Sequence, residues 1–180
     1  MRKVNTYLLL IIAAITIISC KPSLDKSRQK ITTLENELRN STSALDSTKS
    51  KTLIDLYIDF ADRFPNDSSA DKFVFNAARL SVNISKNAEA IKLLDRVTTV
   101  YPQSKFTPEC LFLKAYIYDD KLKDYKNADK YYKEFLNKYP THELAPSAKQ
   151  SLETLGVPAE ALIKIYEQRN AQAKADSIKK

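Results

Sequence analysis

The sequence predicts an all-α fold, a solenoid of about three to four helical hairpins that follows a removable N-terminal leader. Gly156 is the only glycine in 180 residues, whereas sheets joined by tight hairpins generally need more of them. Leu, Ala, Lys, Glu and Asp dominate the composition, which favours helices. An aromatic–proline pair also recurs with the period of a helical-hairpin repeat.

The N-terminal segment has the organisation of a secretory signal. Met1-Arg2-Lys3 is cationic, and a twelve-residue apolar run from Tyr7 to Ile18 is interrupted only by Thr16. As a helix this run would be about 18 Å long, which is too short for the roughly 30 Å core of a bilayer. We therefore expect residues 1–19 to be a signal peptide that is removed, and not a transmembrane helix.

The end of this leader, Ile17-Ile18-Ser19-Cys20, resembles a bacterial lipobox. The resemblance implies cleavage before Cys20 and covalent lipid on its thiol; the alternative is a plain signal peptide with an incidental cysteine. Lys21 follows the cysteine in place of Asp. By resemblance to lipoprotein sorting rules, this implies a lipid-anchored protein of the outer membrane that faces the periplasm. Display on the cell surface stays open.

The net charge and the cysteine content restrict the classes of binding partner and the possible disulfide bonds. Loss of Arg2 and Lys3 with the leader leaves 27 basic against 22 acidic residues, a net charge of +5. The lysines are scattered and the chain is predicted to be exported, so we expect no nucleic-acid partner and a membrane contact through the anchor. Lipidation of Cys20 leaves Cys110 without a partner, which excludes a disulfide framework and favours a buried core residue.

The pairs Phe64-Pro65, Tyr101-Pro102 and Tyr139-Pro140 are 37 and 38 residues apart. Between them, small and bulky residues keep the same phase. Small residues let paired helices approach closely, bulky ones fill the space toward the next hairpin, and proline ends each helix. The small pairs are Ala78 with Ala115 and Ala90 with Ala128, and the bulky pairs are Leu94 with Tyr132 and Val97 with Phe135.

This pattern resembles the tetratricopeptide repeat (TPR), a right-handed α-solenoid. The resemblance covers roughly Leu53 to Gly156. The Tyr-Pro ends and the turn Leu122-Lys123-Asp124-Tyr125 are similar to the periplasmic subtype. That subtype occurs in the lipoprotein of the outer-membrane β-barrel assembly machinery and in the Tol–Pal-associated division coordinator. The fold serves many unrelated functions.

We expect residues 20–50 to hold the lipidated cysteine, a tether and an N-terminal helix, and residues 51–156 to form the repeats. Residues 157–180 should form a capping helix with a polar tail that frays. The N-terminal segment has two interpretations, because Leu24, Ile31, Leu38 and Leu45 recur every seven residues. It is either the first helix of an early hairpin or a short coiled coil. Ser27 and Ser41 at the complementary positions favour the hairpin helix.

No catalytic residue, metal site or cofactor is predicted beyond the covalent lipid, so we expect no enzyme. His142 is the only histidine, and one glycine is too few for a phosphate-binding loop. The neighbours Asp119 and Asp120 diverge by about 100° on a helix, so they do not share a face.

The TPR resemblance implies that certain side chains are presented on the concave face. These are Phe75, Arg79, Phe112, Tyr116 and Asp119. Aromatic and arginine side chains are typical anchors of peptide-binding surfaces. For Phe75 and Phe112, packing between adjacent helices is an open alternative.

These features together predict a membrane-anchored periplasmic scaffold for envelope proteins or peptides, acting in cell-envelope or outer-membrane assembly or maintenance. An outer-membrane assembly complex is one candidate partner. Two alternatives are a coiled-coil oligomer similar to the division coordinator and a protein that binds peptidoglycan or another glycan.

Overall fold

The structure, a computed structural model, describes residues 23–41 and 46–178. The leader, Cys20 and Leu45 lie outside these residues. Throughout the described ranges the regular structure is helical and no strand occurs. The elements are α2 (Leu24–Asn40), α3 (Ser47–Arg63), α4 (Ala70–Asn83), α5 (Asn87–Val100), α6 (Thr107–Tyr116), the π-helix η1 (Ile117–Lys121), α7 (Tyr125–Lys138), α8 (Ala145–Thr154) and α9 (Ala159–Ile178).

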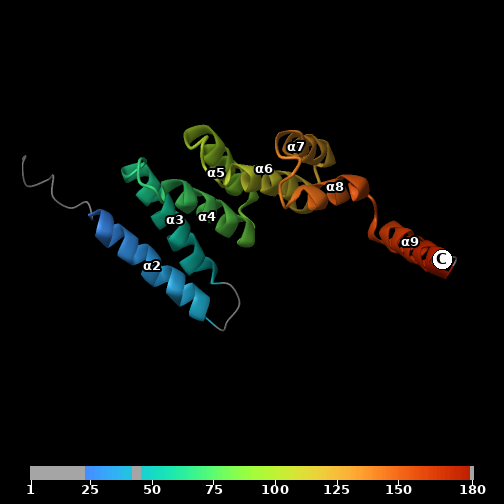
Figure 1. The fold of residues 1–180 in the computed structure, drawn as a ribbon. Coiled ribbons are helices and arrows are strands. Elements are labelled where there is room, and N and C mark those ends of the chain that lie inside the picture. The colour runs from blue at the N-terminus through green and yellow to red at the C-terminus, as the bar shows by residue number, and fades with distance from the viewer. Residues whose placement is uncertain (1–22, 42–45, 179–180) are drawn as a thin grey trace, which may run out of the picture.

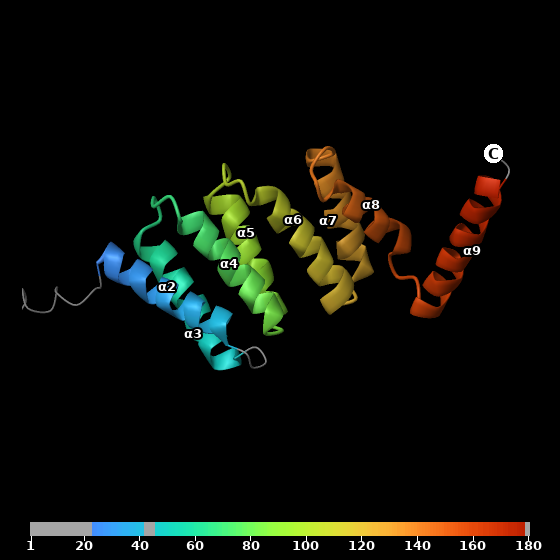
Figure 2. The ribbon, with the colours of Figure 1, turned by 60° about the horizontal axis from the view of Figure 1, so that its bottom comes forward.

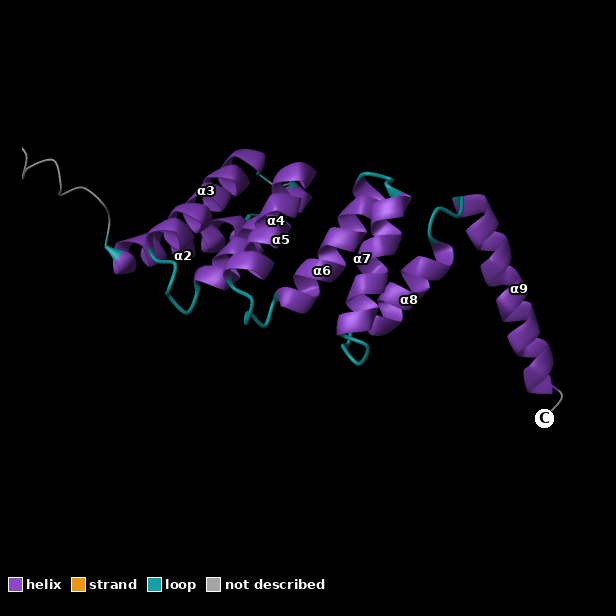
Figure 3. Cartoon of the chain, turned by 90° about the horizontal axis from the view of Figure 1, so that it is seen from above, coloured by secondary structure: helices purple, strands orange, loops and turns teal. Residues whose placement is uncertain are grey.

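The helices form successive hairpins that lie side by side. Helices α2 and α3, α4 and α5, and α6 and α7 pair in chain order, and α8 follows the third pair (Figure 1). The turns that join α4 to α5 and α6 to α7 lie along one edge, whereas the connections between hairpins lie along the opposite edge (Figure 2). The view from above shows the same succession, with α9 set apart at its end (Figure 3). The predicted all-α stack of helical hairpins is confirmed.

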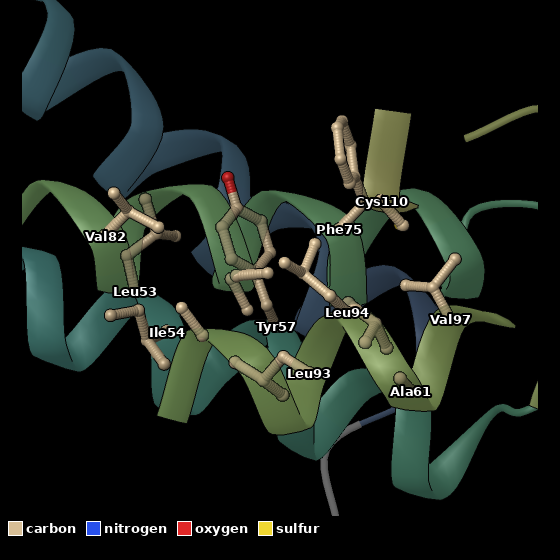
Figure 4. Close-up of a cluster of buried hydrophobic side chains, with 14 of the residues drawn as sticks. Leu53, Ile54, Tyr57, Ala61, Phe75, Val82, Leu93, Leu94, Val97 and Cys110 are labelled. Carbon is tan, nitrogen blue, oxygen red and sulfur yellow. The ribbon is translucent and has the colours of Figure 1, made fainter. Parts of the chain in front are cut away.

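The core lies between the two rows of helices and follows the phase that the sequence predicts. The small residues Ala78, Ala90, Ala115 and Ala128 are all 0% exposed. The bulky residues at the predicted positions are also buried, and Leu94 and Val97 lie in the cluster with Leu53, Tyr57 and Cys110 (Figure 4). A second cluster holds Tyr132 and Phe135. Close helix approach at the alanines therefore fixes the spacing within each hairpin.

Helix α2 packs against α3 as the first helix of a hairpin. Ile31 is buried in the core, and Leu34 and Leu38 pack against the same cluster. Ser27 is also buried, and Arg63 Nη1 donates a hydrogen bond to its Oγ at 3.3 Å. The apolar face of α2 thus packs on other helices of the same chain. Of the two interpretations of this segment, the structure shows the first helix of a hairpin.

The π-helix η1 accounts for the unequal repeat lengths. Ala78 and Ala90 are 12 residues apart, whereas Ala115 and Ala128 are 13 apart. In η1 the Leu122 amide donates to the Ile117 carbonyl at 3.0 Å, which closes a wide turn of five residues. A π-turn takes up one extra residue without unwinding the helix. The helices of the longer repeat therefore still meet in phase.

Side-chain hydrogen bonds join α8 to the middle of helix α9. Gln150 Nε2 donates to the Tyr166 hydroxyl at 3.1 Å, and Arg169 donates to Glu153 at 3.4 Å. Ile163 of α9 is 58% exposed. The helix continues to Ile178, so the predicted C-terminal helix is present, and the fraying of its polar tail stays a prediction.

Candidate functional site

Two adjoining hollows flank α4 on the face formed by the first helices of the hairpins. The hollow between α2 and α4 measures about 290 Å³, and the hollow between α4 and the end of α6 about 360 Å³. Arg79 and Asn83 line both, so the hollows form one surface, which we call the α4 groove. Its other lining residues are Glu35, Leu38, Arg39, Leu53, Tyr57, Asn76, Leu80, Val82, Ser85, Leu113, Tyr116 and Lys121.

Helix α4 presents a polar row along the groove. Asn76, Arg79 and Asn83 are three and four residues apart, which places them on one helical face. Arg79 has no ion pair among the described residues, and its guanidinium lies 5.8 Å from the centre of the Phe75 ring. Phe75 is only 7% exposed and stacks on Phe106 at 4.9 Å. The buried Phe75 ring, stacked on the half-buried Phe106, therefore supports an exposed arginine whose charge is free to meet a partner.

On the α2 side of the groove, the Glu35 carboxylate is held in place by a hydrogen bond from Tyr57. The Tyr57 hydroxyl donates to Glu35 Oε1 at 2.6 Å. Burial, first, and this hydrogen bond raise the pKa of Tyr57 well above its ordinary value, so the phenol stays neutral at physiological pH. Arg39 lines the same hollow. Cationic and anionic groups thus lie together at this end of the groove.

The α6 side of the groove is organised by the π-turn. The Tyr116 hydroxyl donates to Asp120 Oδ2 at 2.9 Å, and Lys121 Nζ lies 2.8 Å from the same oxygen. The Lys121 hydrogen bond, and then that of Tyr116, lower the pKa of Asp120 below its ordinary value. Lys121 Nζ also lies 5.5 Å from the centre of the Tyr116 ring. Tyr116 is therefore held at the rim of the groove by the hydrogen bond of its hydroxyl and by the ammonium group of Lys121 over its ring.

Phe112 and Asp119 are directed toward α7, and the structure does not bring them to the groove. The Phe112 ring lies 5.8 Å from Tyr132 and 5.7 Å from Phe135, centre to centre. Tyr132 donates to Asp119 Oδ2 at 3.4 Å, and burial raises the pKa of Asp119. Residues seven apart share a helical face, so both follow the side of α6 that packs on α7. Of the five predicted residues, Arg79 and Tyr116 line the groove, and Phe75 lies beneath Arg79. Phe112 and Asp119 contact α7 instead.

Sequence reasoning missed several polar residues of the groove, and four of them show why. Asn76 and Asn83 could have been found, because helical spacing from Arg79 places them on its face. Glu35 and Arg39 had no comparable signal, because their place depends on how α2 packs.

A third hollow, of about 290 Å³, lies between α5, α6 and α7. The cationic group that lines it most deeply, Lys114, is already paired with a carboxylate of the same chain. Lys114 is 11% exposed as a side chain, and its Nζ lies 2.6 Å from Asp95 Oδ1 and 4.3 Å from the centre of the Tyr131 ring. These contacts satisfy the ammonium group within the chain. The α4 groove, where Arg79 is unpaired, is therefore the better candidate for a binding surface.

The remaining polar candidate, His142, takes part in the turn before α8. Its Nδ1 accepts a hydrogen bond from the Leu144 amide at 3.2 Å, and its ring packs edge-on against Phe135. In the part of the chain that the structure describes, no three metal-ligating side chains gather. Within residues 23–41 and 46–178, no helix combines the length and the apolar composition that a membrane crossing requires.

Comparison with known proteins identifies the third hairpin. Residues 109–142, which run from α6 through η1 and α7 to the following turn, match the tetratricopeptide repeat family. A search of curated protein sequences found no match. One hairpin of the stack thus matches a tetratricopeptide repeat, and the other hairpins continue the same stack.

Proposed function

We propose that this tetratricopeptide-repeat protein is a lipid-anchored scaffold of the bacterial cell envelope whose α4 groove binds a segment of another protein. Tetratricopeptide repeats suggest protein–protein interaction scaffolds, and the proposal gives that role a surface and a location. The observation that carries it is that Arg79 and Tyr116 line the same hollow. Arg79 lies over the Phe75 ring and has no ion pair among the described residues. Arginine and tyrosine are the side chains that most often anchor protein interfaces.

The groove chemistry fits an extended or helical protein segment. Asn76 and Asn83 each offer a donor and an acceptor, so they can pair with the amide groups of a peptide backbone. Leu80 and Leu113 supply apolar surface between these polar groups. Arg79 would pair with a carboxylate or a carbonyl of the partner.

The location rests on the lipobox-like end of the leader. Two or three acyl chains on Cys20 would hold the protein firmly, because each buried CH₂ contributes about 0.8 kcal/mol. The lysine after the cysteine supports the outer membrane, with the domain facing the periplasm. Cys20→Ala should leave unprocessed or soluble protein in fractionated cells. Normal processing with unchanged membrane retention would contradict the anchor.

Capture of partners from detergent-solubilised envelopes tests the binding role. The wild type should retain a stoichiometric protein, and Arg79→Ala and Tyr116→Ala should each lose about 2 kcal/mol of binding, roughly thirtyfold in affinity. Thr99→Ala, on an exposed part of α5, is the control. Melting temperatures should stay nearly unchanged. A large fall for Tyr116→Ala would place this residue in the core and remove it from the groove.

The alternative functions have less support. A coiled-coil oligomer would need the α2 seam, which packs on α3 through Ile31, Leu34 and Leu38. Light scattering should therefore find a monomer at all concentrations. A glycan-binding role would be revived by co-sedimentation with purified peptidoglycan.

A further inference from the structure

A hollow at the N-terminal end of the stack is separate from the α4 groove. It measures about 670 Å³ and lies between α2 and α3. Helix α2 is the first described helix, and the stack extends away from it (Figure 1). We call the lining the terminal surface; it includes Lys26, Lys30, Thr33, Leu34, Thr52 and Leu56. Leu34 and Leu56 are half-buried and give this surface its apolar centre.

The terminal surface is positively charged. Lys26 and Lys30 are exposed, lie one helical turn apart and have no ion pair among the described residues. The carboxylate of the same surface, Glu37, is paired with Lys49 at 2.8 Å, so its charge is compensated. From residue 21 to residue 31 the chain has four basic residues and one acidic residue, and of the four only Arg28 has a described ion pair, with Asp67 at 2.6 Å. The surface therefore complements a layer of negative charge.

Its place in the chain brings this surface close to the predicted anchor. Helix α2 begins at Leu24, four residues after Cys20. Four residues span at most about 14 Å, and Lys30 lies about 9 Å further along the helix. A bilayer that holds Cys20 is thus within reach of the whole basic part of α2.

We propose that the terminal surface docks onto the anionic phospholipid headgroups of the membrane that holds the anchor. This inference rests on the proposed lipidation of Cys20. Once the chain is tethered, docking is intramolecular, and each lysine near an anionic bilayer favours it about fivefold. Docking lays the first hairpin against the bilayer and directs the following hairpins away from it. The α4 groove and the C-terminal hairpin then stand clear of the lipid.

The test uses the mature lipidated protein, reconstituted in phosphatidylcholine vesicles with or without phosphatidylglycerol. Thr33→Cys places an accessible thiol on the terminal surface, and Thr99→Cys places one on α5. Cys110 is 1% exposed and burial raises its pKa to about 12, so a thiol-reactive fluorophore leaves it unlabelled. Quenching by headgroup-labelled lipid then reports which position lies at the bilayer.

We expect anionic vesicles to quench the label at position 33 several-fold more than the label at position 99. The double variant K26E/K30E should reduce this preference at least tenfold in docking equilibrium, as should high salt. K86E/K92E, which reverses two exposed lysines on or beside α5 that have no ion pair among the described residues, should leave it unchanged. Equal quenching at both positions, or no effect of phosphatidylglycerol or of K26E/K30E, would overturn the proposal. If the protein labelled at position 33 instead self-associates in a concentration-dependent manner without vesicles, the terminal surface binds a second copy of the chain and not lipid.

Failure of the anchor is distinguishable from failure of docking. If the protein does not float with vesicles, lipidation of Cys20 is refuted. In that event the Cys20→Ser variant, held on nickel-chelating lipid by an N-terminal histidine tag, supplies the tether. The same comparison of positions 33 and 99 then decides whether the terminal surface docks.

Discussion

Enlargement of Ala128 tests the helix packing on which the stack depends. Ala128 is 0% exposed in α7, in the same cluster as the fully buried Ala115 of α6. Ala128→Leu adds three carbon atoms where the structure leaves no exposed surface. Overpacking of this kind costs about 1–3 kcal/mol of unfolding free energy. In a domain of this size, each kcal/mol lowers the melting temperature by about 2–4 °C, so the fall should be roughly 2–12 °C.

Thermal unfolding followed by circular dichroism measures this change, and Lys126→Leu provides the matched control. Lys126 lies two residues away on the exposed side of α7, so the same new side chain should change stability by less than about 0.5 kcal/mol. Ala128→Leu should therefore unfold clearly below both the control and the wild type. Equal melting temperatures for the two variants would refute the close approach of α6 and α7 at this alanine.

Three further predictions concern backbone strain and pH. Ser85→Gly should stabilise the chain by about 0.5–1 kcal/mol in thermal unfolding, because Ser85 has a φ of 60° that glycine adopts without strain; a lower melting temperature would count against it. Gly156→Ala should destabilise by about 1 kcal/mol or more, because Gly156 has a φ of 71° and a Cβ there would lie 3.3 Å from Tyr125 Cδ2; an unchanged melting temperature would contradict this. Burial, and less so Asp119, raises the pKa of Tyr132 to about 12, so the folded state favours the neutral phenol. Its contribution is present below pH 10 and is lost as pH rises from 10 to 12, by about 2–3 kcal/mol. Tyr132→Phe should lose less stability over this interval in denaturant titrations, and an identical loss would contradict the assignment.

The helical hairpins could be predicted from the sequence because their cause is local. The aromatic–proline pairs end helices, and alanines such as Ala78 and Ala90 occur where helices must approach closely. These residues act through the helix period alone, so no tertiary information is needed. The one-residue difference between the repeats was visible as well, but its absorption in η1 was not, because either connecting turn could have lengthened instead.

The groove could be predicted only in part, because it depends on the rotation of helices about their axes. Arg79 and Tyr116 face the groove, whereas Phe112, four residues before Tyr116, packs on α7. Positions four residues apart on a helix differ by only about 40°, so a small rotation of the helix decides which of them faces the core and which the surface. Glu35 of α2 lines the groove and accepts a hydrogen bond from Tyr57 of α3, 22 residues away. Such a long-range contact leaves no local pattern in the sequence.

The central claim is that the α4 groove binds a protein partner, and site-specific photo-crosslinking in intact cells tests it most directly. A photoreactive amino acid at Asn83, which is exposed in the groove, should give one discrete adduct. The same amino acid at Thr99 on α5 should give none, and Arg79→Ala should abolish the adduct from position 83. An adduct from position 99 alone, or an adduct from position 83 that Arg79→Ala leaves unchanged, would contradict the account.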